Sequence, residues 1–506
     1  MGSIAGWLTR HATFDPDRPA VVSADCTLGY AALAARVATL ANWLREERGL
    51  APGARIAWLG HNHVDLLALL FACADTGLVL VPLNWRLTAH ELDRVLDDAG
   101  AALVVVETHC ATFLPELGHW PLVTCGFASG SLARMPEETR AGLPLPGAVS
   151  VDDRAPLLLV YTSGTTGLPR GAALSQRALL FNALNSVHMH DLGSADRVLN
   201  VLPMFHVGGL NIQTVPALYC GATVLLAERF ETATTLAWIR RAQPTLCVLV
   251  PAMIEALVAA PNWRDTDLGS LRAVATGSTD VPRAVIQYLH ARGVPVIQIY
   301  GSTETGPIAI YQRIEHATSE VGSIGCAGLH TEIRLVDGDG HDVGTDEPGQ
   351  ILVRGPHVAS GYWNARRQAV DGFADGWFAS GDVATRDARG RYWFKDRIKH
   401  VIISGGENIY PAELERVLAE SGLVREAAIA PRADARWGQV PVVVAVRGEQ
   451  AVDAAALLAV FEGRVARYKR PREVIFVDAL PRTALGKVAV ATLRELVGEA
   501  AVRGVG

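Results

Sequence analysis

The sequence predicts an α/β protein. Its large N-terminal domain consists of sheets flanked by helices plus a small antiparallel β unit, and a small α+β C-terminal domain follows. Three observations predict this organisation. In the first half of the chain, short continuous apolar runs alternate with stretches of helical periodicity. Near residue 330 the pattern changes to short strands joined by Gly/Asp turns. A charged stretch at residues 395–400 then precedes a tail of mixed strands and helices.

The apolar runs of the N-terminal domain are typical of strands that are buried on both faces. A helix is expected at residues 30–46, where apolar residues recur at three-to-four spacing. Continuous apolar strands separated by such helices favour largely parallel sheets that are covered on both sides. The expected strands lie at residues 56–59, 78–81, 103–106, 157–161, 222–226, 246–250 and 296–300.

The small β unit is expected at about residues 325–390. Residues 331–336 and 350–354 have the composition of strands, and the Gly/Asp segment at 337–340 has that of a turn. Short strands joined by such turns favour antiparallel pairing, because a tight turn connects antiparallel neighbours.

The tail after residue 400 is predicted to be a separate α+β domain. Its first helix begins with Pro411, which suits the first helical position, and Glu413 and Glu415 lie near the positive end of that helix. Further strands are expected at residues 401–403, 427–430, 440–446 and 473–477. We therefore predict domains at residues 1–396 and 397–506.

Composition excludes several classes of protein. The 506 residues contain 46 Lys plus Arg and 52 Asp plus Glu, a net charge of −6. This balance offers no general cationic surface for nucleic acid or anionic lipid, although it permits a local phosphate site. With 50% hydrophobic residues, the chain has ample apolar surface for a folded core. Oligomeric state is not readable from the sequence.

The chain is expected to be a cytoplasmic protein without an integral membrane segment. Its N-terminus lacks the apolar core of a signal peptide. The longest clean apolar run near the front, residues 66–74, is bracketed by Asp65 and Asp75 and is too short for a bilayer that needs about 20 residues. Seven widely spaced cysteines, an odd number without a CxxC motif, favour reduced thiols.

The most informative segment is the Gly/Ser/Thr-rich stretch that follows the expected strand at 157–161. Residues 162–171 read TSGTTGLPRG. Glycines permit backbone conformations in which successive N–H groups point into one concavity, and the hydroxyls add further donors, so the segment can hold a polyphosphate. It lacks the residue order of a Walker A loop. Taken alone, a segment of this composition is more often a mobile surface loop than a phosphate site.

Seven further blocks accompany this loop in a characteristic order. Together they resemble the AMP-forming adenylating enzymes: acyl- and aryl-CoA synthetases, peptide-synthetase adenylation domains and luciferases. The resemblance covers essentially the whole chain. The blocks are residues 202–209, 276–278, 300–305, 376–382, 395–397, 404–408 and 481–487.

The resemblance implies a two-step reaction with ATP, Mg²⁺ and coenzyme A. A carboxylic acid attacks the α-phosphate of ATP to give an acyl-adenylate and pyrophosphate, and a thiol then displaces AMP. The first step brings two anions together, so the site must supply positive charge. The chain is thus expected to be an acid–CoA ligase that forms a carbon–sulfur bond. Adenylation followed by loading of a carrier-protein phosphopantetheine thiol is the alternative, and a non-catalytic nucleotide-binding protein is a third reading.

Catalytic roles carry over to four residues by this resemblance. Lys487 matches the lysine that reaches the substrate carboxylate and the nucleotide during adenylation. Glu304 matches the metal-binding glutamate, with Thr303 beside it as a phosphate-contacting hydroxyl. His206 matches an aromatic or imidazole gate beside the acyl pocket.

The nucleotide site is implied in the same way. Tyr300 would stack on adenine, Asp382 would accept both ribose hydroxyls, and Arg397 would assist at the ribose. The backbone around Gly277 and Ser278 would line the base pocket. The phosphate loop contributes Thr162, Ser163, Gly164, Thr165, Thr166, Gly167 and Arg170.

The implied acid pocket contains mostly small or apolar residues and no Lys or Arg. A buried second carboxylate would need a paired cation, so this favours an aryl or medium-chain fatty acid over a dicarboxylate. The identity of the acid stays open. The pocket residues are His206, Val207, Gly208, Gly209, Asn211, Met253, Gly301 and Ser302.

A hinge and a coenzyme A channel are implied at the start of the C-terminal domain. Lys399 matches the hinge about which that mobile domain rotates after adenylation. Ser404, Gly405 and Gly406 resemble the segment that lines the pantetheine channel, and Trp437 resembles a second contact on the coenzyme A side.

Two local features depart from the family pattern or stand outside it. Arg170 occupies the position of a usual lysine in the phosphate loop, which keeps the cation but changes its geometry. The His-x-His pairs at residues 61/63 and 188/190 have no acidic third ligand or HExxH context, so they are interpreted as structural histidines.

Overall fold

Two units make up the chain in the computed structural model. The first consists of Met1–Ile333 and Leu352–Ala379, and the second of Arg334–Ile351 and Ser380–Gly506. The predicted boundary between residues 396 and 397 falls within the second unit and stays a prediction. The structure describes residues 3–126, 132–136, 138–139, 152–163, 169–277, 281–364, 372–404, 407–434, 437–448, 452–465, 467–482 and 488–503.

A seven-stranded sheet in the first unit is built mainly from the predicted apolar runs. Strands β6, β5, β3, β4 and β8 pair in parallel, in agreement with the sequence-based expectation. β9 returns antiparallel to β8, and the sequence analysis did not anticipate this hairpin. The sheet order is β7-β6-β5-β3-β4-β8-β9. The bounds are β3 Arg55–Leu59, β4 Val79–Leu83, β5 Ala101–Glu107, β6 Leu122–Cys125, β7 Ala133–Arg134, β8 Pro156–Ser163 and β9 Pro169–Ser175.

A nine-stranded sheet forms the other half of the first unit. Its central strands are parallel, and antiparallel strands close both edges. The strand expected at 246–250 ends at Val248, because Pro251 begins a helix two residues after Leu249. The order is β16-β15-β14-β13-β12-β10-β11-β1-β2. The bounds are β1 Pro19–Val22, β2 Thr27–Gly29, β10 Arg197–Asn200, β11 Thr223–Leu226, β12 Leu246–Val248, β13 Ala273–Gly277, β14 Val296–Tyr300, β15 Ile310–Tyr311 and β16 Cys326–Ala327.

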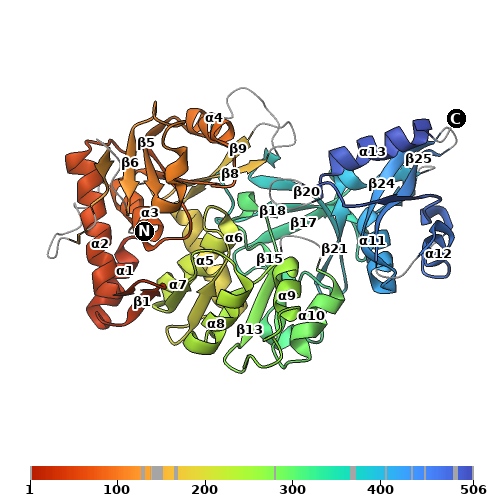
Figure 1. Ribbon diagram of the computed structural model, residues 1–506, viewed down its shortest axis with the longest axis horizontal. Helices are drawn as coiled ribbons and strands as arrows, with labels where there is room; N and C mark the ends of the chain where they lie inside the picture. Colours follow the sequence, from red (N-terminus) through yellow and green to blue (C-terminus); the bar gives the residue numbers. More distant parts are fainter. Residues whose placement is uncertain are drawn as a thin grey trace. The chain divides into compact units, whose positions relative to one another are not determined.

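Helices fill the space between these two sheets and cover their outer faces. Trp58 and Val198 point into the shared inner core, whereas the next residues, Leu59 and Leu199, point to the outer helices, as the alternation of a strand requires. Figure 1 shows α9 and α10 beside β13. The inner helices are α1 Gly6–Phe14, α2 Tyr30–Asn42, α3 Val64–Thr76, α5 Gln176–His190, α6 Val207–Asn211 and α7 Thr214–Cys220; α2 continues as a π-helical turn, Trp43–Glu47. The outer helices are α4 Ala89–Ala99, α8 Thr232–Ala242, α9 Pro251–Val258 and α10 Arg283–His290.

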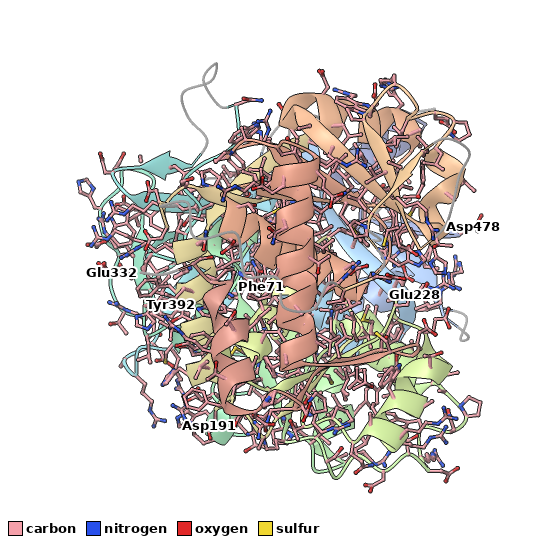
Figure 2. All side chains as sticks on the ribbon, turned by 90° about the vertical axis from the view of Figure 1, so that its left-hand side faces the viewer. Phe71, Asp191, Glu228, Glu332, Tyr392 and Asp478 are labelled. Atoms are coloured by element: carbon pink, nitrogen blue, oxygen red, sulfur yellow. The ribbon has the colours of Figure 1, made fainter. Side chains whose placement is uncertain are left out.

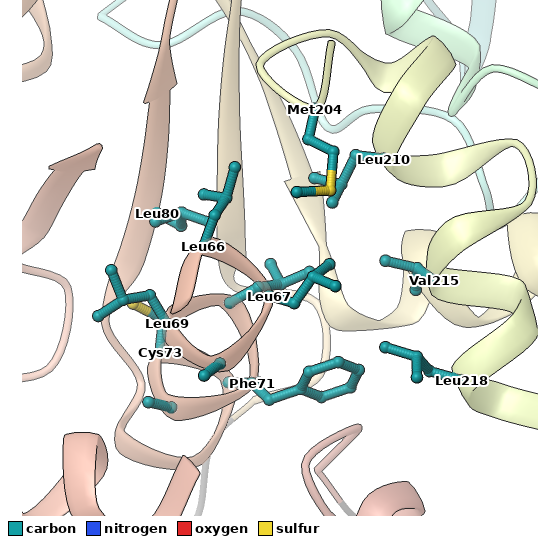
Figure 3. Packing of buried hydrophobic residues seen from close by; sticks show 14 of the residues in the cluster. Leu66, Leu67, Leu69, Phe71, Cys73, Leu80, Met204, Leu210, Val215 and Leu218 are labelled. Atoms are coloured by element: carbon teal, nitrogen blue, oxygen red, sulfur yellow. The ribbon is translucent and has the colours of Figure 1, made fainter. Parts of the chain in front are cut away.

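Helix α3 is apolar on nearly every side because other elements surround it. Leu67 and Phe71 point toward Val215 and Leu218 of α7 (Figure 3), and all four side chains are buried. Phe71 lies in the interior of the unit, whereas the charged Asp191 lies at its periphery (Figure 2). The apolar run that is too short to cross a membrane is therefore the central packing helix of the first unit.

One ion pair is buried beside α3. Arg36 Nε lies 2.7 Å from Asp65 Oδ1, and the two side chains are only 6% and 10% exposed. A second hydrogen bond joins Arg36 Nη2 to Asp65 Oδ2 at 3.0 Å, which makes the pair bidentate. Such geometry compensates for removing both charges from water.

Replacing Arg36 with methionine is expected to lower the free energy of unfolding by about 3–5 kcal/mol, because Asp65 would remain buried without its cation. Urea denaturation measures this loss. The double variant Arg36→Met/Asp65→Leu should recover much of it, because no buried charge remains. Equal destabilisation of the single and double variants would contradict the assignment.

A five-stranded sheet corresponds to the predicted small β unit. Its order is β17-β18-β20-β19, with β21 paired to β20. β19 and β21 both run antiparallel to β20, which confirms the predicted antiparallel character. The bounds are β17 Glu332–Val336, β18 Gly349–Arg354, β19 Phe373–Ala374, β20 Trp377–Arg386 and β21 Tyr392–Arg397.

The C-terminal part of the second unit is an α+β structure, as predicted. Alternate residues of β25 face opposite layers: Val443 packs with Leu414 of α11, and Val444 packs with Leu493 of α13. Figure 1 shows α13 and α11 on opposite faces of β24 and β25. The sheet order is β23-β22-β25-β24, with β26 paired to β25. The bounds are β22 Ile402–Ser404, β23 Glu407–Ile409, α11 Pro411–Ser421, β24 Val424–Asp434, β25 Gly438–Arg447, α12 Ala454–Ala459, β26 Val474–Val477 and α13 Val490–Arg503.

Two further observations bear on the sequence-based expectations. Over the described part of the chain, no helix combines the length and the apolar character that crossing a membrane requires. All seven cysteines are described and none forms a disulfide; four of them are buried.

Candidate active site

The predicted phosphate loop connects the two strands of the β8–β9 hairpin. Thr162 pairs with Arg170 and Ser163 with Pro169, so both ends of the loop are held next to each other. β8 ends at Ser163, two residues beyond the predicted strand end, because antiparallel pairing with β9 extends it. The side chain of Ser163 lies outside the described residues, as do Gly164, Thr165, Thr166 and Gly167.

Two predicted nucleotide residues lie at one edge of the nine-stranded sheet. β13 ends at Gly277 and its parallel neighbour β14 ends at Tyr300, with Gly277 opposite Ile299 in the register. The carboxyl ends of adjacent parallel strands are where α/β proteins bind ligands. A Cβ atom on Gly277 would lie 2.4 Å from the Ile299 carbonyl oxygen, so this position requires glycine. Ser278 lies outside the described residues.

The chain turns sharply after Tyr300 to place Glu304. Thr303–Thr305 form one turn of 3₁₀ helix, η3, and the Ser302 backbone N–H donates to Thr305 Oγ1 at 2.8 Å. A Cβ on Gly301 would lie 1.7 Å from the Pro307 carbonyl oxygen, so no other residue permits this turn. The predicted residues Gly301, Ser302, Thr303 and Glu304 are thus presented together at the sheet edge.

Glu304 is a buried carboxylate that accepts from one side-chain donor among the residues that the structure describes. It is 8% exposed, and the Tyr362 hydroxyl donates to its Oε1 at 2.6 Å. Among the described residues, no cation lies within ion-pair distance of Glu304. A buried carboxylate without a cationic partner carries an uncompensated charge, which a divalent cation would neutralise. The residue therefore fits the predicted role of a Mg²⁺ ligand, because Mg²⁺ takes oxygen donors and uses one or two carboxylates.

His357, which the sequence analysis missed, supports η3 from within the fold. Its Nδ1–H donates to the Thr305 carbonyl oxygen at 2.7 Å, and its Nε2 accepts from the Thr331 hydroxyl at 2.8 Å. Burial lowers the pKa of His357 from 6.5 to about 4, so the ring is neutral at pH 7. No local motif marks this histidine, because its partners lie 52 and 26 residues away.

The buried histidines predict how stability depends on pH. Burial lowers the pKa of His190 to about 4 as well. A lowered histidine pKa means that the unfolded chain binds the proton first, so the free energy of unfolding falls as the pH drops from about 6.5 to about 4. Each group should contribute roughly 3 kcal/mol across that window. Thermal melts between pH 7.5 and 4.5 measure the slope, and His357→Asn, which does not titrate, should flatten it. An unchanged slope in that variant would contradict the assignment.

The predicted acid pocket is organised by the short helix α6. His206 precedes it, and its Nδ1 accepts the Gly208 N–H at 3.0 Å. Asn211 Nδ2 donates to the Gly306 carbonyl oxygen at 3.0 Å, which ties α6 to the segment that follows η3. Met204, which precedes α6, and Leu210, which lies within it, pack near Leu67 of α3 (Figure 3). Val207 and Gly209 are buried in the same helix, and Met253 is half-buried at the start of α9.

In the second unit, Asp382 and Arg397 face each other across β20 and β21. They are register partners, and Arg397 Nε lies 3.2 Å from Asp382 Oδ1. The Asp382 side chain is 9% exposed and the Arg397 side chain 48% exposed. Ser380 Oγ accepts the Asp382 backbone N–H at 3.1 Å and so orients the aspartate backbone. A nearly buried carboxylate beside a guanidinium suits the predicted contact with ribose hydroxyls.

The predicted hinge and coenzyme A residues are described only in part. Ser404 is buried and pairs with Gly438, the residue after Trp437. The Trp437 ring faces the Arg472 guanidinium at 5.8 Å. The side chain of Lys399 lies outside the described residues, as do Gly405, Gly406 and Lys487 in full.

His61 has an acidic neighbour, which differs from the sequence-based expectation for this His-x-His pair. The structure brings an acidic group to it: His61 Nδ1 donates to Glu228 Oε1 at 2.5 Å, and His109 Nε2 lies 3.6 Å from the same oxygen. The two imidazole rings stack with only 18° between their planes, so their in-plane lone pairs do not converge on one ion. The cluster links the ends of β3 and β5 to the end of β11, and its geometry favours a hydrogen-bonded connection over a metal centre.

The chain matches known proteins both in sequence and in structure. The sequence model of a family described as AMP-binding enzyme matches residues 8–363, and that of the AMP-binding enzyme C-terminal domain matches residues 413–487. Indoleacetate–CoA ligase of Aromatoleum aromaticum is 46% identical over 500 residues, covering 98% of each chain. Feruloyl-CoA synthase of Amycolatopsis sp. is 39% identical over 500 residues, covering 98% of this chain and 99% of that protein. The structure of o-succinylbenzoate CoA synthetase from Bacillus subtilis with its acyl-adenylate intermediate aligns with a TM-score of 0.85 at 30% identity, covering 96% of this chain and 97% of that one.

Proposed function

Because the chain belongs to the AMP-binding enzyme family, we propose that it activates an aryl carboxylic acid with ATP and transfers the acyl group to coenzyme A. It is a ligase that forms a carbon–sulfur bond and uses ATP, Mg²⁺ and coenzyme A. The observation that carries the residue-level proposal is the buried Glu304 carboxylate in the η3 turn that follows β14. The cytoplasmic location expected from the sequence stays a prediction.

The proposed mechanism assigns each group one task. The acid carboxylate attacks the α-phosphorus of ATP and pyrophosphate leaves; the coenzyme A thiolate then attacks the acyl carbonyl and AMP leaves. Glu304 would hold Mg²⁺, which when bound neutralises charge on the phosphate oxygens. Lys487 would bridge the two reacting anions, and Asp382 would fix the ribose. His206 would close the acid pocket.

Two features of the predicted pocket support an aryl acid that carries no charge besides its reacting carboxylate. None of its residues is Lys or Arg, so a second carboxylate would find no cation there. Asn211 is 1% exposed, and its Oδ1 has no hydrogen-bond partner among the described residues. A buried amide oxygen needs a donor, which an N–H or O–H group on an aromatic acid could supply. The indoleacetate and feruloyl ligases among the relatives act on acids of this kind. A medium-chain fatty acid, which lacks such a donor, is the second candidate.

A panel of acids tests the proposal. Indole-3-acetate, ferulate, 1-naphthaleneacetate, octanoate and succinate are each incubated with ATP and Mg²⁺. Pyrophosphate release is measured with and without coenzyme A, and the thioester is detected by mass. Indole-3-acetate should exceed 1-naphthaleneacetate, which lacks the N–H, by at least about 100-fold in kcat/KM.

Each alternative has its own outcome in this panel. Thioester from octanoate alone would replace the aryl proposal with a fatty acid. Pyrophosphate released without any coenzyme A thioester would instead favour a carrier-protein thiol as the acceptor.

A further inference from the structure

Two side chains, Arg170 and Tyr362, connect the phosphate-loop hairpin to Glu304. The Arg170 guanidinium lies over the ring of Tyr362 at 5.5 Å from its centroid. The Tyr362 hydroxyl donates to Glu304 Oε1 at 2.6 Å. Phe373 meets the Tyr362 ring at 5.7 Å with 80° between the ring planes, an edge-to-face contact. The tyrosine ring is therefore held by a cation and by a second aromatic side chain.

The backbone of Tyr362 is fixed to β9 as well. Tyr362 forms an isolated antiparallel bridge with Ala172. On either side of it, the Trp363 N–H donates to the Gly171 carbonyl at 2.7 Å and the Ala173 N–H donates to the Gly361 carbonyl at 3.0 Å. Gly171, Ala172 and Ala173 directly follow Arg170 at the exit of the phosphate loop. The position of the tyrosine hydroxyl is thus set by the strand that leaves the loop.

We propose that Tyr362 is a positioning residue for Glu304 and that Arg170 holds its ring in place. This inference rests on the proposed role of Glu304 as the Mg²⁺ ligand. The Tyr362 hydroxyl donates to Oε1 of Glu304 and so restricts rotation of the carboxylate. The other oxygen, Oε2, is then presented to the cation in one orientation. Mg²⁺ demands nearly ideal octahedral geometry, so a fixed carboxylate lowers the cost of binding it.

The contact also gives a physical reason for arginine at position 170. A guanidinium is planar and stacks on an aromatic face, whereas a lysine ammonium is a compact, strongly hydrated charge. The arginine therefore supplies positive charge next to the phosphate loop and packs on Tyr362 at the same time. The departure from the family pattern is thereby linked to the geometry of the metal ligand.

Tyr362→Phe tests the proposal, because it keeps the ring and removes only the hydroxyl. The Mg²⁺ concentration for half-maximal pyrophosphate release should rise about tenfold, while kcat at saturating Mg²⁺ changes by less than about threefold. Mn²⁺ affinity of the full-length protein with ATP, measured by electron paramagnetic resonance, should weaken by a similar factor. Arg170→Lys should shift the Mg²⁺ requirement in the same direction by a smaller factor, and it provides a second test if Tyr362→Phe fails to fold.

A matched control lies on the same hairpin. The Tyr161 hydroxyl donates to Asp98 Oδ2, also at 2.6 Å, without contacting Glu304. Tyr161→Phe should therefore leave the Mg²⁺ requirement unchanged. An unchanged requirement in Tyr362→Phe, or a fall in kcat and melting temperature alone, would overturn the inference. Glu304→Gln separates the two proposals: if it leaves Mg²⁺ dependence unchanged, the proposed role of Glu304 fails, whereas a raised requirement in Glu304→Gln only would remove just the role of Tyr362.

Discussion

Replacing Lys487 with alanine is expected to reduce acyl-adenylate formation by about 10²–10³-fold, because the two reacting anions lose the cation proposed to bridge them. A supplied acyl-adenylate should still react with coenzyme A at close to the wild-type rate. Residues on both sides of the 483–487 segment are paired: Arg482 forms a bridge with Val488, and the Ala489 N–H donates to the Pro481 carbonyl at 2.8 Å. This pairing anchors both flanks of the segment that carries the lysine.

Pyrophosphate release with acid and ATP measures the first half-reaction, and thioester formation from adenylate plus coenzyme A measures the second. Lys469→Ala is the matched control, because this lysine belongs to the same unit and forms an ion pair with Glu413 at 2.8 Å. Its adenylation rate should stay near that of the wild type. Wild-type adenylation by Lys487→Ala would show that the assigned role is wrong.

Lys399→Pro is expected to affect the two half-reactions in the opposite way to Lys487→Ala. Adenylation should be spared and thioester formation from a supplied adenylate should fall by at least about 100-fold, if rotation at this position builds the thiol site. The backbone of Lys399 lies in the single 3₁₀ turn η6, Ile398–His400, between β21 and β22. Immediately before this turn, the buried Asp396 carboxylate accepts the N–H groups of Arg397 at 2.7 Å and Ala412 at 2.9 Å. A proline fixes φ near −65° and removes the rotation that a hinge requires.

Lys399→Ala provides the control, because it removes the side chain but leaves the backbone free to rotate. Its thioester rate should stay within a few-fold of the wild type. Equal loss of both half-reactions in Lys399→Pro would argue against a hinge at this residue, and equal behaviour of the proline and alanine variants would assign the effect to the side chain.

Most of the fold could be predicted from local sequence because its strands are buried on both faces. The run at 56–59 is continuously apolar and the run at 296–300 is interrupted only by Gln298; they became β3 and β14 within one residue of the prediction. The hairpin strand β9 was missed because its apolar part is only Ala172–Ala173–Leu174, and its pairing with β8 is a tertiary contact. The periodicity and composition of the sequence predict which residues are buried, but they do not predict which strands pair with each other.

The candidate site was likewise only partly predictable from the sequence. The blocks around Glu304 and Asp382 were visible in the sequence, whereas the position of Arg397 beside Asp382 comes from the register across β20 and β21. Tyr362 and His357 were not predicted. Their hydrogen bonds to Glu304 and to the Thr305 carbonyl span 58 and 52 residues, so no local spacing records them.

The sequence by itself determined the class of this protein: the alternation of apolar runs and helices set the α/β architecture, and the ordered blocks indicated an adenylating ligase. Only the tertiary structure decided what surrounds the key carboxylate. The packing of strands and loops that are distant in sequence brings the Tyr362 hydroxyl and the His357 ring to η3. It also places the Arg170 guanidinium over the Tyr362 ring. Residue types are local properties of a chain, whereas the position of a hydrogen-bond donor next to a buried carboxylate depends on how the whole unit packs.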